Sequence, residues 1–164
     1  MAQAVIPGRV TASIDGDFVV FIIGMRINKW WNPASFLQPL TAMRPMLTEL
    51  KAAGPDSGLL HFERPGMLTF IQYWRSFEHL EAYARSPDQK HWPAWVEFNR
   101  RFRNRRGDVG IWHETYLVKA GQYEAIYSGM PPMGLALAGH RSTVADTTVS
   151  ARDRLGEAAP DSKG

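Results

Sequence analysis

Hydrophobic positions along the chain follow strand-like and helix-like patterns in turn. Residues Phe18 to Ile27 are apolar at neighbouring positions, which indicates a strand covered on both faces. Apolar residues then recur at steps of three and four from about Pro33 to Ala53. Pro39 and Pro45 fall inside this second pattern, so it predicts a broken or kinked helix.

A hairpin, a divided helix and a last strand complete the pattern. Arg64-Pro65-Gly66 suits a type II turn between two strands, and Ser76 suits the N-cap of the next helix. The predicted elements are, in order, Leu59–Glu63, Met67–Trp74, Ser76–Arg85 with a second helical segment after Pro87 to about Asn104, and Gly110–Val118.

The order strand, helix, strand, strand, helix, strand predicts an α+β fold of the ferredoxin-like βαββαβ type with an antiparallel sheet. Its first, third and fourth strands are apolar on both faces, whereas the predicted helices cover one face. We therefore expect a homodimer that pairs two sheets in a dimeric α+β barrel. The expected organisation is an N-terminal arm (1–15), the barrel domain (16–139) and a flexible C-terminal tail (140–164), whose sequence holds no aromatic residue.

Composition narrows the function classes. The 164 residues contain six Trp, eight Phe and five Tyr, which is typical of a bulky core, a pocket or an interface. There is no cysteine, which excludes disulfides and thiolate ligands and is compatible with the cytoplasm. No apolar run approaches the ~20 residues of a membrane helix. We expect a cytoplasmic protein that binds a small-molecule substrate and neither nucleic acid nor membrane.

Charge adds one feature, the basic run Asn99–Arg106, within a formal net charge of +3. The run suits a solvated helix C-terminus, where cations complement the macrodipole. It also suits partners for an anionic cofactor. No recognisable nucleic-acid module surrounds it.

Two histidines are predicted to point inward. His91 shares a helical face with Trp95, Phe98 and Phe102, and His113 shares a strand face with apolar neighbours. Each can be a core histidine bound to a backbone group, or an iron ligand or acid–base group. His61 and Glu63 also share a strand face, but their position beside the predicted turn favours exposure.

Three segments carry a resemblance to known proteins: QYWRSFEHLEAYARSPDQKHWPAWVEFNRRF, VGIWHETYLV and YEAIYSGMPPMGLALAG. They resemble a bacterial and fungal family of short proteins that is described as monooxygenase-like or of unknown function. The same segments are similar to the C-terminal half of the haem-containing aldoxime dehydratases, which remove water from an aldoxime to give a nitrile.

The resemblance implies roles for particular residues. His91 is the implied proximal ligand of the iron of haem b, with Trp95 and Arg101 beside the cofactor. His113, with Glu114 in the His-Glu motif, is the implied catalytic acid–base position. Trp74, Tyr73 and Trp112 are expected to line the substrate pocket.

Two other functions remain open at this point. One is a monooxygenase of the antibiotic-biosynthesis type, with or without haem, which acts on a small aromatic substrate with His113 as general base. The other is a carrier of haem or of a small hydrophobic ligand without catalysis. The fold does not choose among the three, because one fold hosts many functions.

Overall fold

The computed structural model describes residues 4–37, 48, 52, 54–85, 107–145 and 149–155, and the statements below refer to these residues. Of the predicted site, His91, Trp95 and Arg101 lie outside them, as does the predicted helical segment after Pro87. Within the described ranges, no helix is long and apolar enough to cross a membrane.

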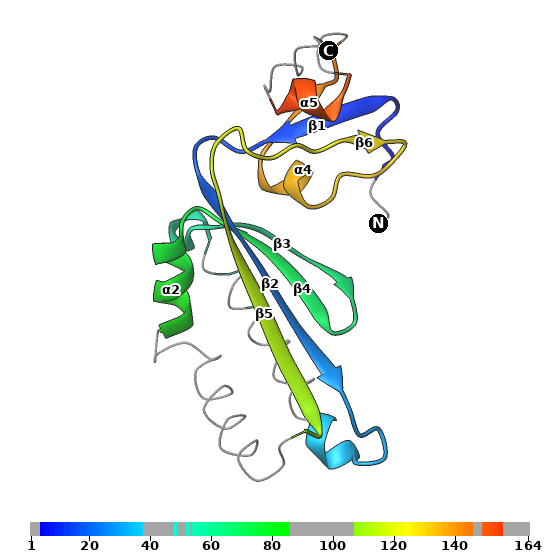
Figure 1. Cartoon of the computed structure of the whole chain (residues 1–164), viewed down its shortest axis with the longest axis vertical. Helices are drawn as coiled ribbons and strands as arrows, with labels where there is room; N and C mark the ends of the chain where they lie inside the picture. Colours follow the sequence, from blue (N-terminus) through cyan, green and yellow to red (C-terminus); the bar gives the residue numbers. More distant parts are fainter. Residues whose placement is uncertain are drawn as a thin grey trace, which may run out of the picture.

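A four-stranded antiparallel sheet forms the centre of the molecule (Figure 1). Its order is β3-β4-β2-β5, which is the order of a ferredoxin-like βαββαβ unit, so the predicted fold class is confirmed. The strands are β2 (Phe18–Ile27), β3 (Leu59–Gly66), β4 (Thr69–Trp74) and β5 (Val109–Val118).

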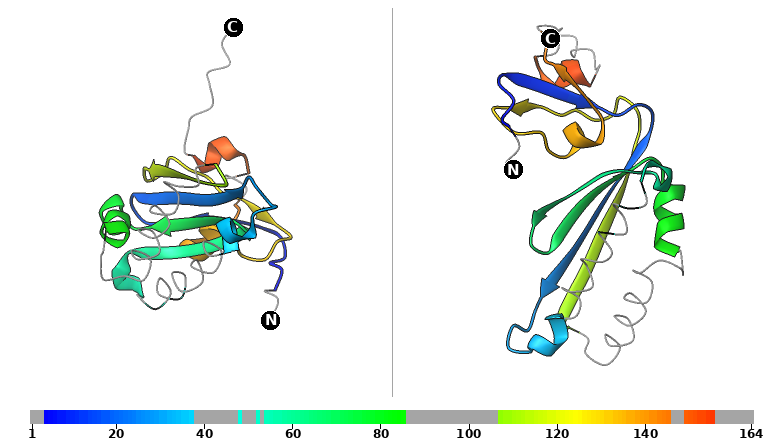
Figure 2. Two further views of the ribbon diagram at one scale, coloured as in Figure 1. Left: turned by 90° about the horizontal axis from the view of Figure 1, so that it is seen from below. Right: turned by 180° about the vertical axis from the view of Figure 1, so that it is seen from behind.

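The sheet has two faces with different covers. On the helix face, Val19 of β2 and Trp74 of β4 pack against Leu80 of α2 (Phe77–Arg85). Figure 1 and the rear view in Figure 2 show α2 beside this sheet. On the opposite face, Phe18 packs against Leu135 and Ala136. Residues of neighbouring strands that pair directly lie on one face, so the register assigns every strand residue to a face.

The hairpin turn lies farther along the chain than the sequence predicts. β3 continues through Arg64-Pro65-Gly66, and Gly66 pairs with Thr69, so the turn is at Met67 and Leu68. Proline fits inside β3 because this strand is at the edge of the sheet and its ladder is irregular between Glu63 and Gly66. The prediction of a turn at Arg64-Pro65-Gly66 was therefore wrong.

The chain between β2 and β3 begins as predicted. Residues 33–37 are helical, as are residues 48 and 52; the predicted kink lies outside the described residues. Gly54 has a φ of 66°, a left-handed conformation that suits a residue following a helix. A 3-10 turn, η1 (Pro55–Ser57), then leads into β3.

A second, three-stranded sheet lies at one end of the large sheet (Figures 1 and 2). Its order is β6-β1-β7, and β1 pairs with β7 from Val10–Thr143 to Ser13–His140. The strands are β1 (Arg9–Ser13), β6 (Tyr127–Ser128) and β7 (His140–Thr143). Hence the predicted arm and the predicted tail each contribute a strand to one sheet, which the sequence analysis missed.

The short helix α4 (Leu135–Ala138) lies between the two sheets (Figure 1). Leu135 and Ala136 form a buried cluster with Ala12, Ile14 and Phe18. Tyr123 fixes the linker between β1 and β2, because its hydroxyl donates to the carbonyl of Ile14 (2.9 Å) and accepts from its N–H (2.6 Å). The C-terminal segment is thus part of the core.

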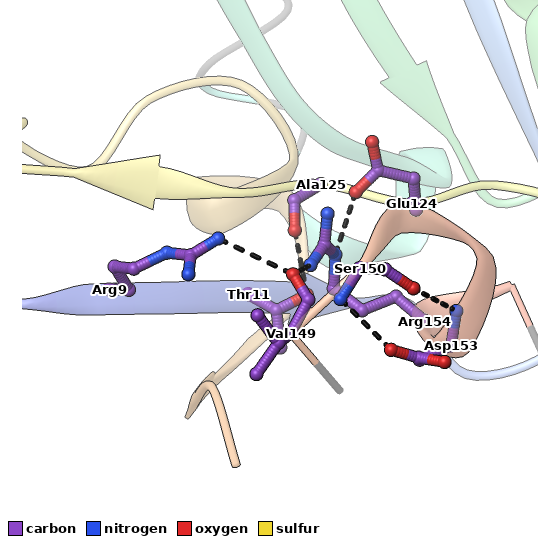
Figure 3. Close-up of polar contacts among 8 residues, drawn as sticks. All are labelled: Arg9, Thr11, Glu124, Ala125, Val149, Ser150, Asp153 and Arg154. Carbon is purple, nitrogen blue, oxygen red and sulfur yellow. Dashed lines mark hydrogen bonds and ion pairs between the residues drawn. The ribbon is translucent and has the colours of Figure 1, made fainter. Parts of the chain in front are cut away.

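The last described residues are anchored by polar contacts (Figure 3). Ser150 and Asp153 form a capping box at the start of α5 (Ala151–Arg154). Arg154, with 7% of its side chain exposed, pairs with Glu124 at 2.8 Å (Nε to Oε2). Within the range 140–164 that is expected to be a flexible tail, residues 140–143 thus form a strand and residues 151–154 a helix.

Candidate functional site

His113 lies on the helix face of β5. It pairs with Ile23 of β2, and its ring contacts the ring of Phe21 at 5.6 Å between centroids. Phe21 in turn packs against the cluster of Val19, Trp74 and Leu80 beneath α2. The imidazole therefore lies on the face of the sheet that carries α2, and it is exposed rather than enclosed.

Among the residues that the structure describes, the side chains around His113 are largely apolar and exposed. Ile111 and Leu117 share its face, and they are 46% and 68% exposed. His113 is exposed as well, and Phe21 and Ile23 are half-buried. An imidazole beside exposed aliphatic side chains and the ring of Phe21 suits a flat, largely apolar ligand.

These residues fit haem in part. A porphyrin needs apolar contact on its faces and an imidazole on the iron axis or near the bound substrate, and the helix face around His113 offers both. Three or more His, Asp or Glu side chains grouped as a metal site do not occur among the described residues. A haem iron needs no such group, since one axial histidine holds it.

Glu114 does not accompany His113. Successive strand residues point to opposite faces, so Glu114 lies on the opposite face, where it pairs with Ile22. Its carboxylate accepts a hydrogen bond from the hydroxyl of Tyr116. That bond and the negative charge of Glu114 raise the pKa of Tyr116. The structure therefore separates the two residues of the predicted catalytic pair.

The three residues expected to line the pocket are separated too. Trp74 is 0% exposed on the helix face, where its Nε1 donates to Oε1 of Gln72 at 2.9 Å. Tyr73 and Trp112 lie on the opposite face, and the indole of Trp112 covers Gly24 so closely that a Cβ there would be 2.5 Å from Nε1. Trp74 is thus a core residue rather than a neighbour of the other two.

A polar cluster on the opposite face was not predicted. His61 and Glu63 were expected to be exposed, but their side chains are only 22% and 18% exposed. They face Tyr73 of β4 and Tyr127 of β6. The prediction of exposure was wrong for two reasons. The hairpin turn lies beyond Gly66, so it is farther from His61 and Glu63 than predicted. The segment leading into α4 also covers this part of β3.

Asp108 fixes the loop at the far end of β2 and β5. Its buried carboxylate accepts from Asn32 Nδ2 (3.0 Å) and Ser35 Oγ (2.8 Å) and pairs with Lys29 Nζ (2.6 Å). Lys29 first, then Ser35 and Asn32, hold the pKa of Asp108 below its usual value. This anchor sets the exit of the chain from β2.

The anchor predicts a pH dependence of stability. Because the pKa of Asp108 is lower in the folded chain, the unfolded chain binds more protons in the acid range. The contribution to stability is complete above about pH 4 and is lost as the pH falls through the folded pKa. In Asp108→Asn we expect a lower melting temperature at neutral pH and a flatter dependence between pH 5 and pH 2.5. A uniform decrease at every pH would contradict this assignment.

Fold and helix-face surface together define a class: an α+β protein of the dimeric α+β barrel type, with a histidine on the helix face of its sheet. Residues 18–135 match the family model "Monooxygenase af470-like", and the chain belongs to that family.

Two similar proteins add detail. Monooxygenase af470 of Aspergillus fumigatus is 29% identical over 156 residues, covering 79% of this chain and 53% of the relative. A crystal structure of an aldoxime dehydratase, OxdRE, with butyraldoxime has a TM-score of 0.57 at 18% identity and covers 93% of this chain and 44% of that one. The chain thus spans about half the length of each (53% and 44%). At this identity, the second likeness supports the fold alone.

Proposed function

We propose that this chain is an enzyme that binds haem b on the helix face of the sheet and acts on a small substrate with an N–O bond. His91 is the proposed proximal iron ligand, with Trp95 beside the ring and Arg101 paired with a propionate. The observation that supports the proposal most is His113, which lies exposed on the helix face beside the exposed apolar side chains of Ile111 and Leu117.

His113 is the proposed acid–base group. In the dehydration of an aldoxime, the N–O bond breaks, the hydroxyl group takes up a proton and leaves as water, and the aldehydic C–H proton is released. A ring nitrogen of His113 can supply the first proton and later accept the second. Bound haem supplies the iron that holds the substrate nitrogen. Glu114 faces away from His113, so we assign the proton transfers to the imidazole alone.

A second copy of the chain is part of the proposal. The chain spans 44% of the aldoxime dehydratase whose fold it shares. On the opposite face of the sheet, Trp112 and Tyr116 remain 41% and 49% exposed. Pairing of two sheets on this face would bury both residues and supply the second half of the barrel.

The alternative function is a monooxygenase that acts on a small aromatic substrate, with His113 as general base. The family assignment of residues 18–135 favours it, since the family is described by that activity. The apolar side chains described on the helix face, Phe21 and Ile111 among them, suit a flat aromatic substrate as well as a porphyrin. If the monooxygenase uses no cofactor, haem binding distinguishes the proposed dehydratase from it.

A titration with hemin tests the proposal. We expect a saturable Soret band at one haem per chain in the purified protein, abolished in His91→Ala and unchanged in His140→Ala, which removes an exposed histidine. Reduced, haem-loaded protein is then offered butyraldoxime, and nitrile is measured by gas chromatography. A titration that matches free hemin would remove the haem reading and leave the cofactor-free monooxygenase.

Turnover then separates enzyme from carrier. Haem binding together with nitrile formation supports the dehydratase reading. Haem binding with neither nitrile formation nor oxygenation of an aromatic substrate would identify a carrier and refute the proposed activity.

A further inference from the structure

Two adjacent tryptophans are exposed on the loop that follows β2. Trp30 is 63% exposed and Trp31 is 77% exposed, the highest value among the large hydrophobic residues that the structure describes. Leu37, on the same short segment, is 55% exposed. One exposed apolar residue is ordinary, but two neighbouring indoles with a leucine on one segment indicate a surface that contacts a partner.

Hydrogen bonds and ring packing fix the conformation of this loop. The N–H groups of Asn28 and Lys29 both donate to the carbonyl oxygen of Asp108, at 2.9 and 3.1 Å, in addition to the side-chain contacts of Asp108 described above. The ring of Trp30 packs against the ring of Phe36 at 5.8 Å between centroids. A preformed apolar loop loses little conformational entropy when it binds.

The loop lies beyond the end of the large sheet. Ile27 pairs with Val109 in the last row of the ladder between β2 and β5, and the tryptophans follow that row. Figures 1 and 2 show the short helical turn 33–37, coloured cyan, at this end, whereas the small sheet lies at the other end. The tryptophans therefore belong neither to the helix face nor to the opposite face that we propose to pair with a second copy.

The charge close to the loop is positive. Within the described segments 26–37 and 107–111, Asp108 is the one carboxylate, and Lys29 pairs with it at 2.6 Å. Arg26, one turn of chain before the loop, is exposed. In the sequence, the run Asn99–Arg106 directly precedes Gly107 and contains five arginines and no carboxylate. This part of the chain therefore suits an anionic partner.

We propose that the loop of Trp30 and Trp31 docks on the surface of a membrane that contains anionic lipids. Indole rings favour the interface between head groups and acyl chains, because they are apolar with one polar N–H. Nearby cations are attracted by the anionic head groups. The expectation of no membrane partner rested on the lack of an apolar run long enough to span, which a surface contact does not need.

Two other partners fit the loop less well. A second copy of the chain would bring the same positive charges together, which opposes association. Single-stranded nucleic acid also binds to cations and aromatic rings, but one ring, Trp30, already packs against Phe36, and Leu37 has no flat face on which a base could stack. A lipid interface accepts aromatic and aliphatic side chains alike.

Co-sedimentation with lipid vesicles tests the proposal. We expect the full chain to bind vesicles of phosphatidylcholine and phosphatidylserine in equal parts, to bind phosphatidylcholine alone more weakly, and to lose affinity as salt is added. Trp31→Ala should weaken binding to the mixed vesicles about tenfold, because the apolar surface of the indole is no longer removed from water. Phe77→Ala is the matched control: Phe77 is 43% exposed at the start of α2, and the vesicle affinity should stay unchanged.

Each result decides the proposal. No binding to the mixed vesicles, or equal binding by Trp31→Ala, would overturn it. Binding of single-stranded RNA, or self-association, that depends on Trp31 without vesicle binding would assign the loop to that partner and would overturn it as well. Trp31→Gln is the second variant if Trp31→Ala does not fold. The hemin titration contains no vesicles, so the proposed function is tested separately.

Discussion

Replacement of Trp74 by alanine is expected to lower the free energy of unfolding by about 3–5 kcal/mol, the usual cost of emptying a fully buried aromatic site. Trp74 is 0% exposed and packs against Val19 and Leu80, and its ring lies 5.5 Å from that of Tyr83. The change also leaves Oε1 of buried Gln72 without its indole donor. Urea unfolding followed by far-UV circular dichroism measures the loss.

Trp112→Ala is the matched control for Trp74→Ala. Trp112 is 41% exposed and covers Gly24 on the opposite face, so less apolar surface returns to water on its removal. We expect a loss of about 1–2 kcal/mol. Similar losses in the two variants would contradict the assignment of Trp74 to the core. Both variants are compared at a protein concentration at which light scattering detects only monomer, because the proposed pairing of two sheets would itself bury Trp112.

The large sheet could be predicted because its signal is local. β2 occupies the predicted range Phe18–Ile27, since a central strand that packs on both faces is apolar along most of its length. β3 runs past its predicted end because it is an edge strand that tolerates Pro65. Arg64 and Pro65 thus mark an edge strand, although Pro followed by Gly is equally typical of a turn.

The small sheet could not be predicted in the same way. β1 (RVTAS) and β7 (HRST) are short, and β7 is exposed throughout, so neither has a hydrophobic pattern. Their pairing joins residues that are more than a hundred positions apart. The ion pair of Glu124 with Arg154 could not be predicted either, because Arg154 lies in the segment whose composition suggested disorder.

Strand periodicity predicts which face of the sheet each candidate residue occupies, but not which residues of different strands meet. The period of two in a strand already places His113 and Glu114 on different faces, and Trp74 and Tyr73 likewise. Grouping them by motif or by aromatic type therefore joined residues that the sheet separates. The polar cluster around Glu63 depends on strand register and on the path of the C-terminal segment, which no local pattern contains.

Replacement of His113 by alanine is expected to lower nitrile formation from butyraldoxime by about 10²–10⁴-fold, the usual contribution of a positioned acid–base group. The same variant should still bind hemin with an intact Soret band, because the proposed proximal ligand is His91. Thr115→Ala is the matched control: Thr115 is the next exposed residue on the same face of β5 and carries no group that titrates near neutrality. Its turnover should stay close to that of the unaltered chain. Loss of hemin binding in His113→Ala would instead make His113 an iron ligand. Unchanged turnover in His113→Ala would show that the imidazole takes no part in the reaction. The proton transfers would then have to be assigned to another residue.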